Sequence, residues 1–190
     1  AIDKRVTVTS AFTDNNIIFF QSEKSYFKDV AEEVGLLSYQ IGDEVTYSRH
    51  PLTFLVEAAD DICYTIIDFE DGINLGLIEE DYALEYLIKL VKSNISTTKY
   101  HSLQTTSDRL SYLRALAINT LITEASQIFL ANEEAILTGS FDQALIDQSA
   151  YKVQIDDILK LSIDNIYRSK EVTEKEIYQY NRLEELNILM

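Results

Sequence analysis

The sequence of 190 residues has few residues that interrupt helices, with only five glycines and one proline. This scarcity favours long helices. Cys63 is the single cysteine, so an internal disulfide is excluded, and such a composition is typical of a reducing compartment. No apolar run approaches the roughly 18 residues that a membrane span needs, and no signal-peptide pattern opens the chain. We therefore expect a cytoplasmic protein with no membrane partner.

Positive charge is also scarce, because 16 Lys and Arg stand against 32 Asp and Glu, a formal net charge of −16. A broad nucleic-acid surface or an anionic-membrane surface needs basic residues, so the net charge argues against both. A small ligand that carries phosphate is still possible, because a bound metal ion can reverse the local field. Apolar residues make up 46% of the chain, enough for a core. The length predicts a single helical region over residues 1–190.

Apolar residues recur at helical spacing along most of the chain, which predicts an all-α fold, an irregular multi-helix array. Residues 1–20 are the exception, since the β-branched runs at 6–9 and 17–20 predict short strands or ordered loop. Residues 37–50 are predicted as a loop and residues 93–107 as a polar connection. The predicted helices lie between Ser22 and Gly35, at 52–71, at 79–93, from 107 or 108 towards Leu137 before Gly139, at 151–168 and at 174–187.

The predicted helix 52–71 has two contrasting faces. At about 100° per residue, with Asp60 at zero, Tyr64 falls near 40° and Asp68 near 80°. Residues 57–71 hold six carboxylates and no basic residue. Such a face is commonly just solvated, but like charges at this spacing repel, and a cation would relieve the repulsion. The apolar side chains are predicted to lie between about 180° and 340°: Leu55, Val56, Ala59, Ile62, Cys63, Ile66, Ile67 and Phe69.

The segment RHPLTFLVEAADDICYTIIDFEDG, residues 49–72, resembles the signature helix of the dGTP triphosphohydrolase family of HD-domain enzymes. Three shorter segments resemble other parts of that family in the same order: FFQSEKSYFKDVAEEVGL (19–36), RALAINTLI (114–122) and SKEVTEKEI (169–177). The resemblance implies a helical array of the HD-domain type. It also implies metal-dependent hydrolysis of a deoxynucleoside triphosphate, dGTP or several dNTPs, to a deoxynucleoside and tripolyphosphate. Homo-oligomers are common in the family.

The resemblance also implies roles for individual residues. Asp60 matches a ligand of a divalent metal such as Mg²⁺ or Mn²⁺. Tyr64 matches the tyrosine that packs on the deoxyribose, and Asp68 matches the carboxylate that binds the 3′-hydroxyl. Lys24 resembles a lysine that contacts phosphate. All four residues are candidate site residues, and none is assigned as the catalytic acid or base.

The family's other metal ligands are a histidine and a His-Asp pair, and this chain contains no His-Asp dipeptide. We therefore expect the chain to be the C-terminal part of such an enzyme and to be inactive alone. Its two histidines are expected to have no role in metal binding: His50 is expected to form a helix-end hydrogen bond, and His101 to face solvent. Cys63, on the apolar arc, is expected to be buried.

A second interpretation is a non-catalytic helical module for oligomerisation or regulation, with the acidic face merely solvated. This interpretation needs no further metal ligands. An upstream histidine and His-Asp pair in the same open reading frame would favour the enzyme.

Overall fold

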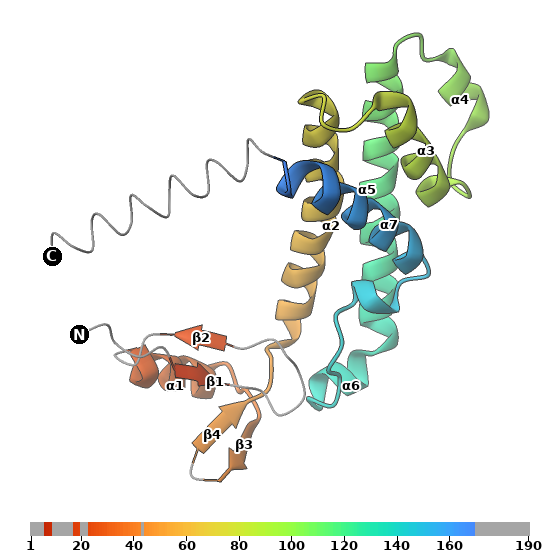
Figure 1. Cartoon of the computed structure of the whole chain (residues 1–190). Coiled ribbons are helices and arrows are strands. Elements are labelled where there is room, and N and C mark those ends of the chain that lie inside the picture. Colours follow the sequence, from red (N-terminus) through yellow and green to blue (C-terminus); the bar gives the residue numbers. More distant parts are fainter. Residues whose placement is uncertain (1–5, 9–16, 20–22, 43, 170–190) are drawn as a thin grey trace, which may run out of the picture. The chain divides into compact units, whose positions relative to one another are not determined.

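A computed structural model of the chain describes residues 6–8, 17–19, 23–42 and 44–169. These described residues form two compact units, one within the ranges 6–58 and 125–149 and the other within 59–124 and 150–169. The two longest helices, α2 (Pro51–Asn74) and α5 (Thr106–Ala131), contribute to both units (Figure 1). Each unit is described by itself below. The predicted helix 174–187 lies outside the described residues, and the single region over 1–190 stays a prediction.

The first unit contains two short antiparallel hairpins. Strands β1 (Val6–Val8) and β2 (Ile17–Phe19) pair, so of the two predicted alternatives the structure has short strands. Helix α1 (Lys24–Glu33) follows, and Gly35 after it has a φ of 70°. Strands β3 (Ser38–Ile41) and β4 (Glu44–Tyr47) then form the second hairpin. The prediction of a loop over 37–50 was therefore wrong. Aromatic and β-branched residues flank Gly42, whose φ of 60° suits a tight turn.

The core of the first unit is built around aromatic side chains. The rings of Phe54 and Phe141 meet edge to face at 5.2 Å, and those of Phe27 and Tyr47 at 5.6 Å. The predicted helix towards Leu137 is interrupted, because α5 ends at Ala131 and α6 (Glu133–Leu137) is separate. The Asn132 side chain donates to the carbonyl of Ile128 at 2.8 Å, a bond that competes with helical continuation. A 3-10 helix, η2 (Ile146–Gln148), completes the unit.

The second unit contains helices joined by short connections and no strand among its described residues, which confirms the all-α prediction. It contains α3 (Glu80–Val91), the short α4 (Thr97–Ser102), α7 (Lys152–Ser162) and a π-helix, η3 (Ile163–Tyr167). Helix α3 packs against α7. Helix α4 falls within the predicted polar connection, and Ser96 caps it by accepting a bond from the Lys99 amide. No helix within the described ranges is long and apolar enough to cross a bilayer.

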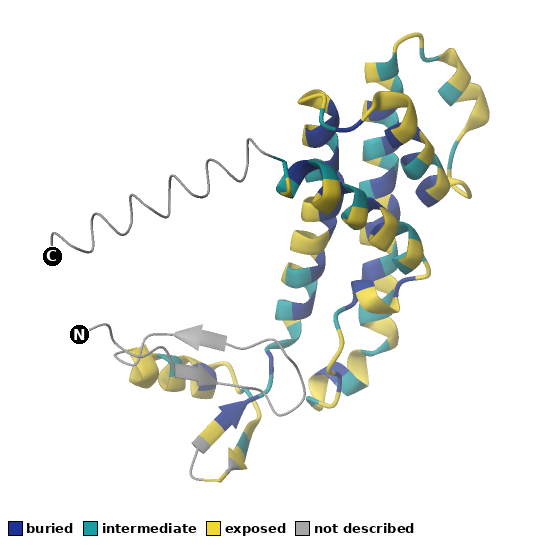
Figure 2. Ribbon diagram, in the orientation of Figure 1, coloured by how far each residue is buried: buried dark blue, intermediate teal, exposed yellow. Residues whose placement is uncertain are grey.

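Burial along α2 differs from the predicted apolar arc. Within the second unit the buried apolar positions are Ile62, Ile66, Phe69 and Ile73, and Figure 2 shows this buried stripe alternating with exposed positions. Cys63 is exposed, so its predicted burial was wrong. Apolar residues cover more than one face of this helix, and the neighbouring helices decide which face is buried. In α3, by contrast, apolar residues at helical spacing are buried together: Leu84, Leu87, Leu90 and Val91.

The predicted helix ended at residue 71, just before Gly72 as its expected stop, but α2 continues to Asn74. A Cβ atom at Gly72 would lie 2.4 Å from Cδ1 of Ile166 in η3, closer than two carbon atoms can approach. Gly72 therefore allows η3 to pack tightly on α2 rather than stopping the helix. This contact fixes the backbone next to Tyr167, the last residue of η3.

Candidate functional site

The acidic face of α2 is partly neutralised by arginines from outside the predicted acidic segment. In the first unit, Glu57 forms an ion pair with Arg49, whose side chain is only 5% exposed and also lies 4.1 Å from the centre of the Phe54 ring. Burial lowers the pKa of Arg49, yet an arginine in proteins stays charged. In the second unit, Nη1 of Arg114 lies 2.8 Å and 2.6 Å from the two carboxylate oxygens of Glu70.

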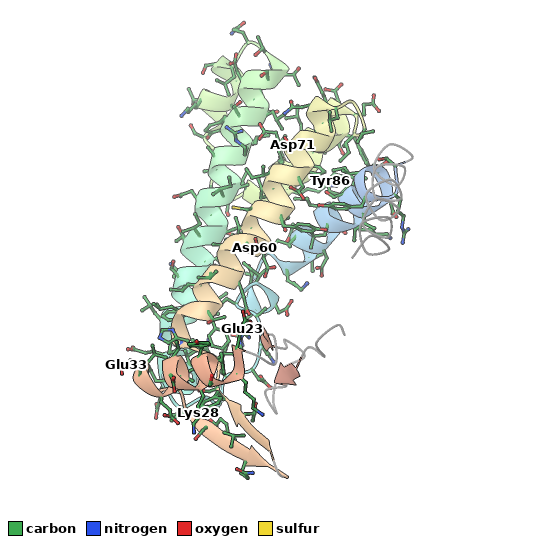
Figure 3. All side chains as sticks on the ribbon, turned by 90° about the vertical axis from the view of Figure 1, so that its left-hand side faces the viewer. Glu23, Lys28, Glu33, Asp60, Asp71 and Tyr86 are labelled. Carbon is green, nitrogen blue, oxygen red and sulfur yellow. The ribbon has the colours of Figure 1, made fainter. Side chains whose placement is uncertain are left out.

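Asp60 differs from these paired acids. Its side chain is exposed, and it forms no hydrogen bond or ion pair with any residue that the structure describes; the same holds for the carboxylate of Asp71, further along α2 (Figure 3). Asp61, the next residue, does interact with the protein. A carboxylate with unused oxygens suits a hard divalent cation. Among the described residues, however, no group of three or more His, Cys, Asp or Glu side chains comes together, so Asp60 offers only one ligand.

The structure places Tyr64 and Asp68 in direct contact with a third residue, Tyr167 of η3. The rings of Tyr64 and Tyr167 are stacked, with centroids 5.4 Å apart and planes 7° apart. The Tyr167 hydroxyl donates to the Asp68 carboxylate. We call these three residues the tyrosine–aspartate cluster. Its Tyr64 side chain remains 46% exposed. Burial, together with the hydrogen bond to Asp68, raises the pKa of Tyr167 well above that of a free tyrosine, so this hydroxyl keeps its proton at neutral pH.

Tyr167 was not predicted from the sequence. The residue lies 99 positions from Asp68, and its direction depends on a π-turn that leaves no recognisable local pattern. The pairing of Glu70 with Arg114 could not be predicted for a similar reason, because the two residues are 44 positions apart, whereas Arg49 lies just before the acidic segment. Only the Tyr64 and Asp68 half of the cluster could be found from helical spacing.

The remaining sequence predictions fall outside the cluster. Lys24 is exposed at the start of α1 in the first unit, and its phosphate contact stays a prediction. His50 accepts a hydrogen bond at Nδ1 from the Leu52 amide at 3.2 Å, which confirms its helix-end role. His101 is exposed, as expected. A cavity of about 600 Å³ in the second unit contains none of the predicted residues. Its lining includes Ile73, Leu77, Ile78, Tyr82, Leu161 and Asn165.

A tyrosine pair on α3 makes a separate, testable prediction. The hydroxyls of Tyr82 and Tyr86 lie 2.9 Å apart, and this hydrogen bond, followed by burial, raises the pKa of Tyr86 to about 12. We expect Tyr82→Phe to lower the Tyr86 pKa towards 10, seen as a shifted phase in the ultraviolet absorbance of phenolate during alkaline titration. A control, Tyr26→Phe in the other unit, should leave that phase unchanged.

The same pair links stability to pH. Because the folded-state pKa of Tyr86 is raised, its contribution to folding is complete below about pH 10 and declines as the pH approaches 12. Unfolding midpoints in urea should therefore fall over this alkaline range, and Tyr82→Phe should make that fall shallower. An unchanged slope in the variant would contradict the hydrogen bond.

Comparison with known proteins gives a consistent set of relatives. The chain is 36% identical over 168 residues to a deoxyguanosinetriphosphate triphosphohydrolase-like protein of Synechocystis sp., covering 88% of this chain and 37% of that protein. It is 28% identical over 170 residues to a protein of the same name from Listeria monocytogenes, covering 84% and 35%. It is 26% identical over 178 residues to the deoxyguanosinetriphosphate triphosphohydrolase of Yersinia enterocolitica, covering 85% and 34%.

The chain thus spans just over a third of the length of the curated relatives it matches. No family model matches it.

Proposed function

Because this chain belongs to the deoxyguanosinetriphosphate triphosphohydrolase family, we propose that it supplies part of the active site of an enzyme that hydrolyses a deoxynucleoside triphosphate. Water attacks the α-phosphorus, the bond from that phosphorus to the 5′-oxygen breaks, and the 5′-oxygen takes up a proton. The products are a deoxynucleoside and tripolyphosphate. The observation that carries the proposal is the match of most of this chain to relatives named for that activity.

The metal site is proposed to include Asp60. Its exposed carboxylate has no partner among the described residues, so no existing contact must be broken before it binds a cation. A divalent ion bound there would polarise the phosphoryl oxygen and lower the pKa of an attacking water. The other ligands of this metal ion are proposed to come from residues other than Asp60. A lone carboxylate binds such ions weakly, so the 190-residue chain alone is proposed to be inactive.

The sugar contacts are proposed to come from the tyrosine–aspartate cluster. The Tyr64 ring offers an apolar plate for the deoxyribose and would crowd a 2′-hydroxyl, which favours deoxy over ribo substrates. Asp68, one helical turn further on, accepts a hydrogen bond from the 3′-hydroxyl. The helical rise puts about 6 Å between Asp60 and Tyr64 and about 12 Å between Asp60 and Asp68. This span suits a ligand held at its α-phosphate and at its 3′-hydroxyl.

Lys24 is proposed to contact phosphate, and the active protein is proposed to be a cytoplasmic homo-oligomer. Lys24 belongs to the first unit and the cluster to the second, so each proposal stands on its own. The alternative of a non-catalytic module predicts no turnover of any nucleotide.

The test is to incubate the full-length protein that carries this chain with each dNTP and Mg²⁺ or Mn²⁺, and to separate the products by ion-exchange chromatography. We expect deoxynucleoside and tripolyphosphate in equal amounts, with the matching ribonucleotides turned over far more slowly. Release of orthophosphate or pyrophosphate, or no turnover of any dNTP, would contradict the proposal.

A further inference from the structure

Tyr167 makes the two contacts that the tyrosine–aspartate cluster would offer to a sugar. Its ring lies flat on Tyr64, at a centroid distance of 5.4 Å, where a deoxyribose would pack. Its hydroxyl donates to the Asp68 carboxylate, as a 3′-hydroxyl would. The Tyr167 side chain therefore resembles the sugar in shape and in hydrogen bonding. This similarity rests on the proposed sugar contacts of Tyr64 and Asp68.

The two occupants exclude each other. A ligand that contacts both Tyr64 and Asp68 must lie on the side of the Tyr64 ring that faces Asp68. Tyr167 already lies on that side, because it touches both residues. A ring stacked in van der Waals contact leaves no space for a second ring on the same face. The sugar and Tyr167 therefore cannot share this position.

We infer that Tyr167 occupies the sugar position in the ligand-free protein, and that a deoxynucleotide binds only after displacing it. Tyr167 thus competes with the substrate for this position and raises the KM of every nucleotide that binds there. A ligand with a 3′-hydroxyl replaces the hydrogen bond that Asp68 loses, so the displacement of Tyr167 changes the hydrogen-bonding free energy at Asp68 only slightly. A ligand without that hydroxyl leaves Asp68 without a donor and binds less well.

The displacement requires only a side-chain movement. The backbone next to Tyr167 is held by Ile166, which packs against Gly72. Tyr167 is the last residue of η3, and its side chain is only half-buried. Rotation about its side-chain bonds can therefore move the ring off Tyr64 while the helix stays in place. The raised pKa of Tyr167 keeps the hydroxyl a donor, so the ligand-free contact persists across the neutral pH range.

The decisive variant is Tyr167→Phe, which keeps the stacked ring and removes the hydrogen bond to Asp68. In the full-length protein we expect the KM for dGTP to fall about tenfold with kcat unchanged, because a hydrogen bond to a charged group no longer stabilises the ligand-free state. The KM ratio of dGTP to 2′,3′-dideoxyGTP should stay as in the wild type, because Tyr167 is displaced by both. A control, Tyr82→Phe, removes another tyrosine hydroxyl of the same unit and should leave KM unchanged.

The outcomes separate this inference from the proposed function. Failure of the wild-type protein to hydrolyse any dNTP overturns the proposed function, and the inference with it. If the wild type hydrolyses dNTPs but Tyr167→Phe has an unchanged or raised KM, the inference alone is overturned. The inference is also overturned if Tyr167→Phe discriminates less well against the dideoxy substrate, because Tyr167 would then support the bound sugar instead of leaving its position.

Alkaline titration of the 190-residue chain provides a test without ligand. The number of tyrosine hydroxyls that stay protonated well above pH 10 should be larger by one in the wild type than in Tyr167→Phe. If the hydroxyl removed by Tyr167→Phe ionises like a free tyrosine, the contact with Asp68 is absent and the inference is overturned.

Discussion

Asp60→Ala in the full-length protein is expected to abolish dNTP hydrolysis, a loss of several orders of magnitude, and to reduce the bound metal. The variant deletes one coordinating carboxylate and the charge that holds the cation. The structure adds a reason to expect little damage to the fold, since Asp60 is exposed and has no described partner. Hydrolysis assays, metal content and circular dichroism on the same samples measure the three effects separately.

The matched control is Asp61→Ala. It removes the same chemical group one residue along, where the side chain is turned by about 100° around the helix. This variant should retain metal and activity, although Asp61 contacts the protein and its loss can lower stability slightly. If Asp61→Ala lost the metal while Asp60→Ala remained active, the assignment on this helix would be wrong by one residue. A third variant, Asp68→Asn, should retain metal and mainly raise KM.

Glu57→Gln is expected to be the most destabilising of the single changes considered, by about 3 kcal/mol. The substitution leaves the Arg49 cation, whose side chain is 5% exposed, without its counter-ion. Loss of one partner of a buried pair costs more than loss of both, because the remaining charge stays desolvated. The midpoint of urea unfolding, followed by circular dichroism, measures the effect. If the free energy of unfolding fell by less than about 0.5 kcal/mol, this pair would contribute no more than an ordinary surface ion pair.

A double-mutant cycle separates the pair from the individual side chains. Arg49→Met removes the buried cation and keeps an unbranched side chain against the Phe54 ring, which lies 4.1 Å from the guanidinium. Combined with Glu57→Gln, it should cost less than the sum of the two single changes, because no unpaired charge remains. Strict additivity would show that Arg49 and Glu57 do not stabilise each other.

Helix positions and one face of the site could be predicted from the sequence, because they follow from local spacing. Asp60, Tyr64 and Asp68 are four residues apart, and four residues make about one helical turn, so any structure with this helix places them in one row. His50 could be predicted for the same reason, since its helix-end bond reaches only to Leu52.

Features that depend on contacts distant in sequence could not be predicted. Cys63 was placed on the wrong face because the apolar residues of α2 cover more than one face and the packing partners select between them. Gly72 looked like a helix stop, since its role depends on Ile166.

The second hairpin was overlooked although its signal was local, because four-residue strands carry too few alternations to stand out from loop.

The π-helix η3 holds one extra residue just before Tyr167. The amide of Arg168 bonds to the carbonyl of Ile163 at 3.1 Å, five residues back, so this turn holds one residue more than an α-helical turn. Because a π-turn uses about one residue more per revolution than an α-helical turn, deleting one residue between 163 and 166 would restore an α-helical turn and leave Tyr167 pointing in nearly the same direction. The same deletion in a regular α-helical segment would rotate every following residue by about 100°, so this turn is where the chain tolerates a change of length without moving Tyr167 away from Asp68.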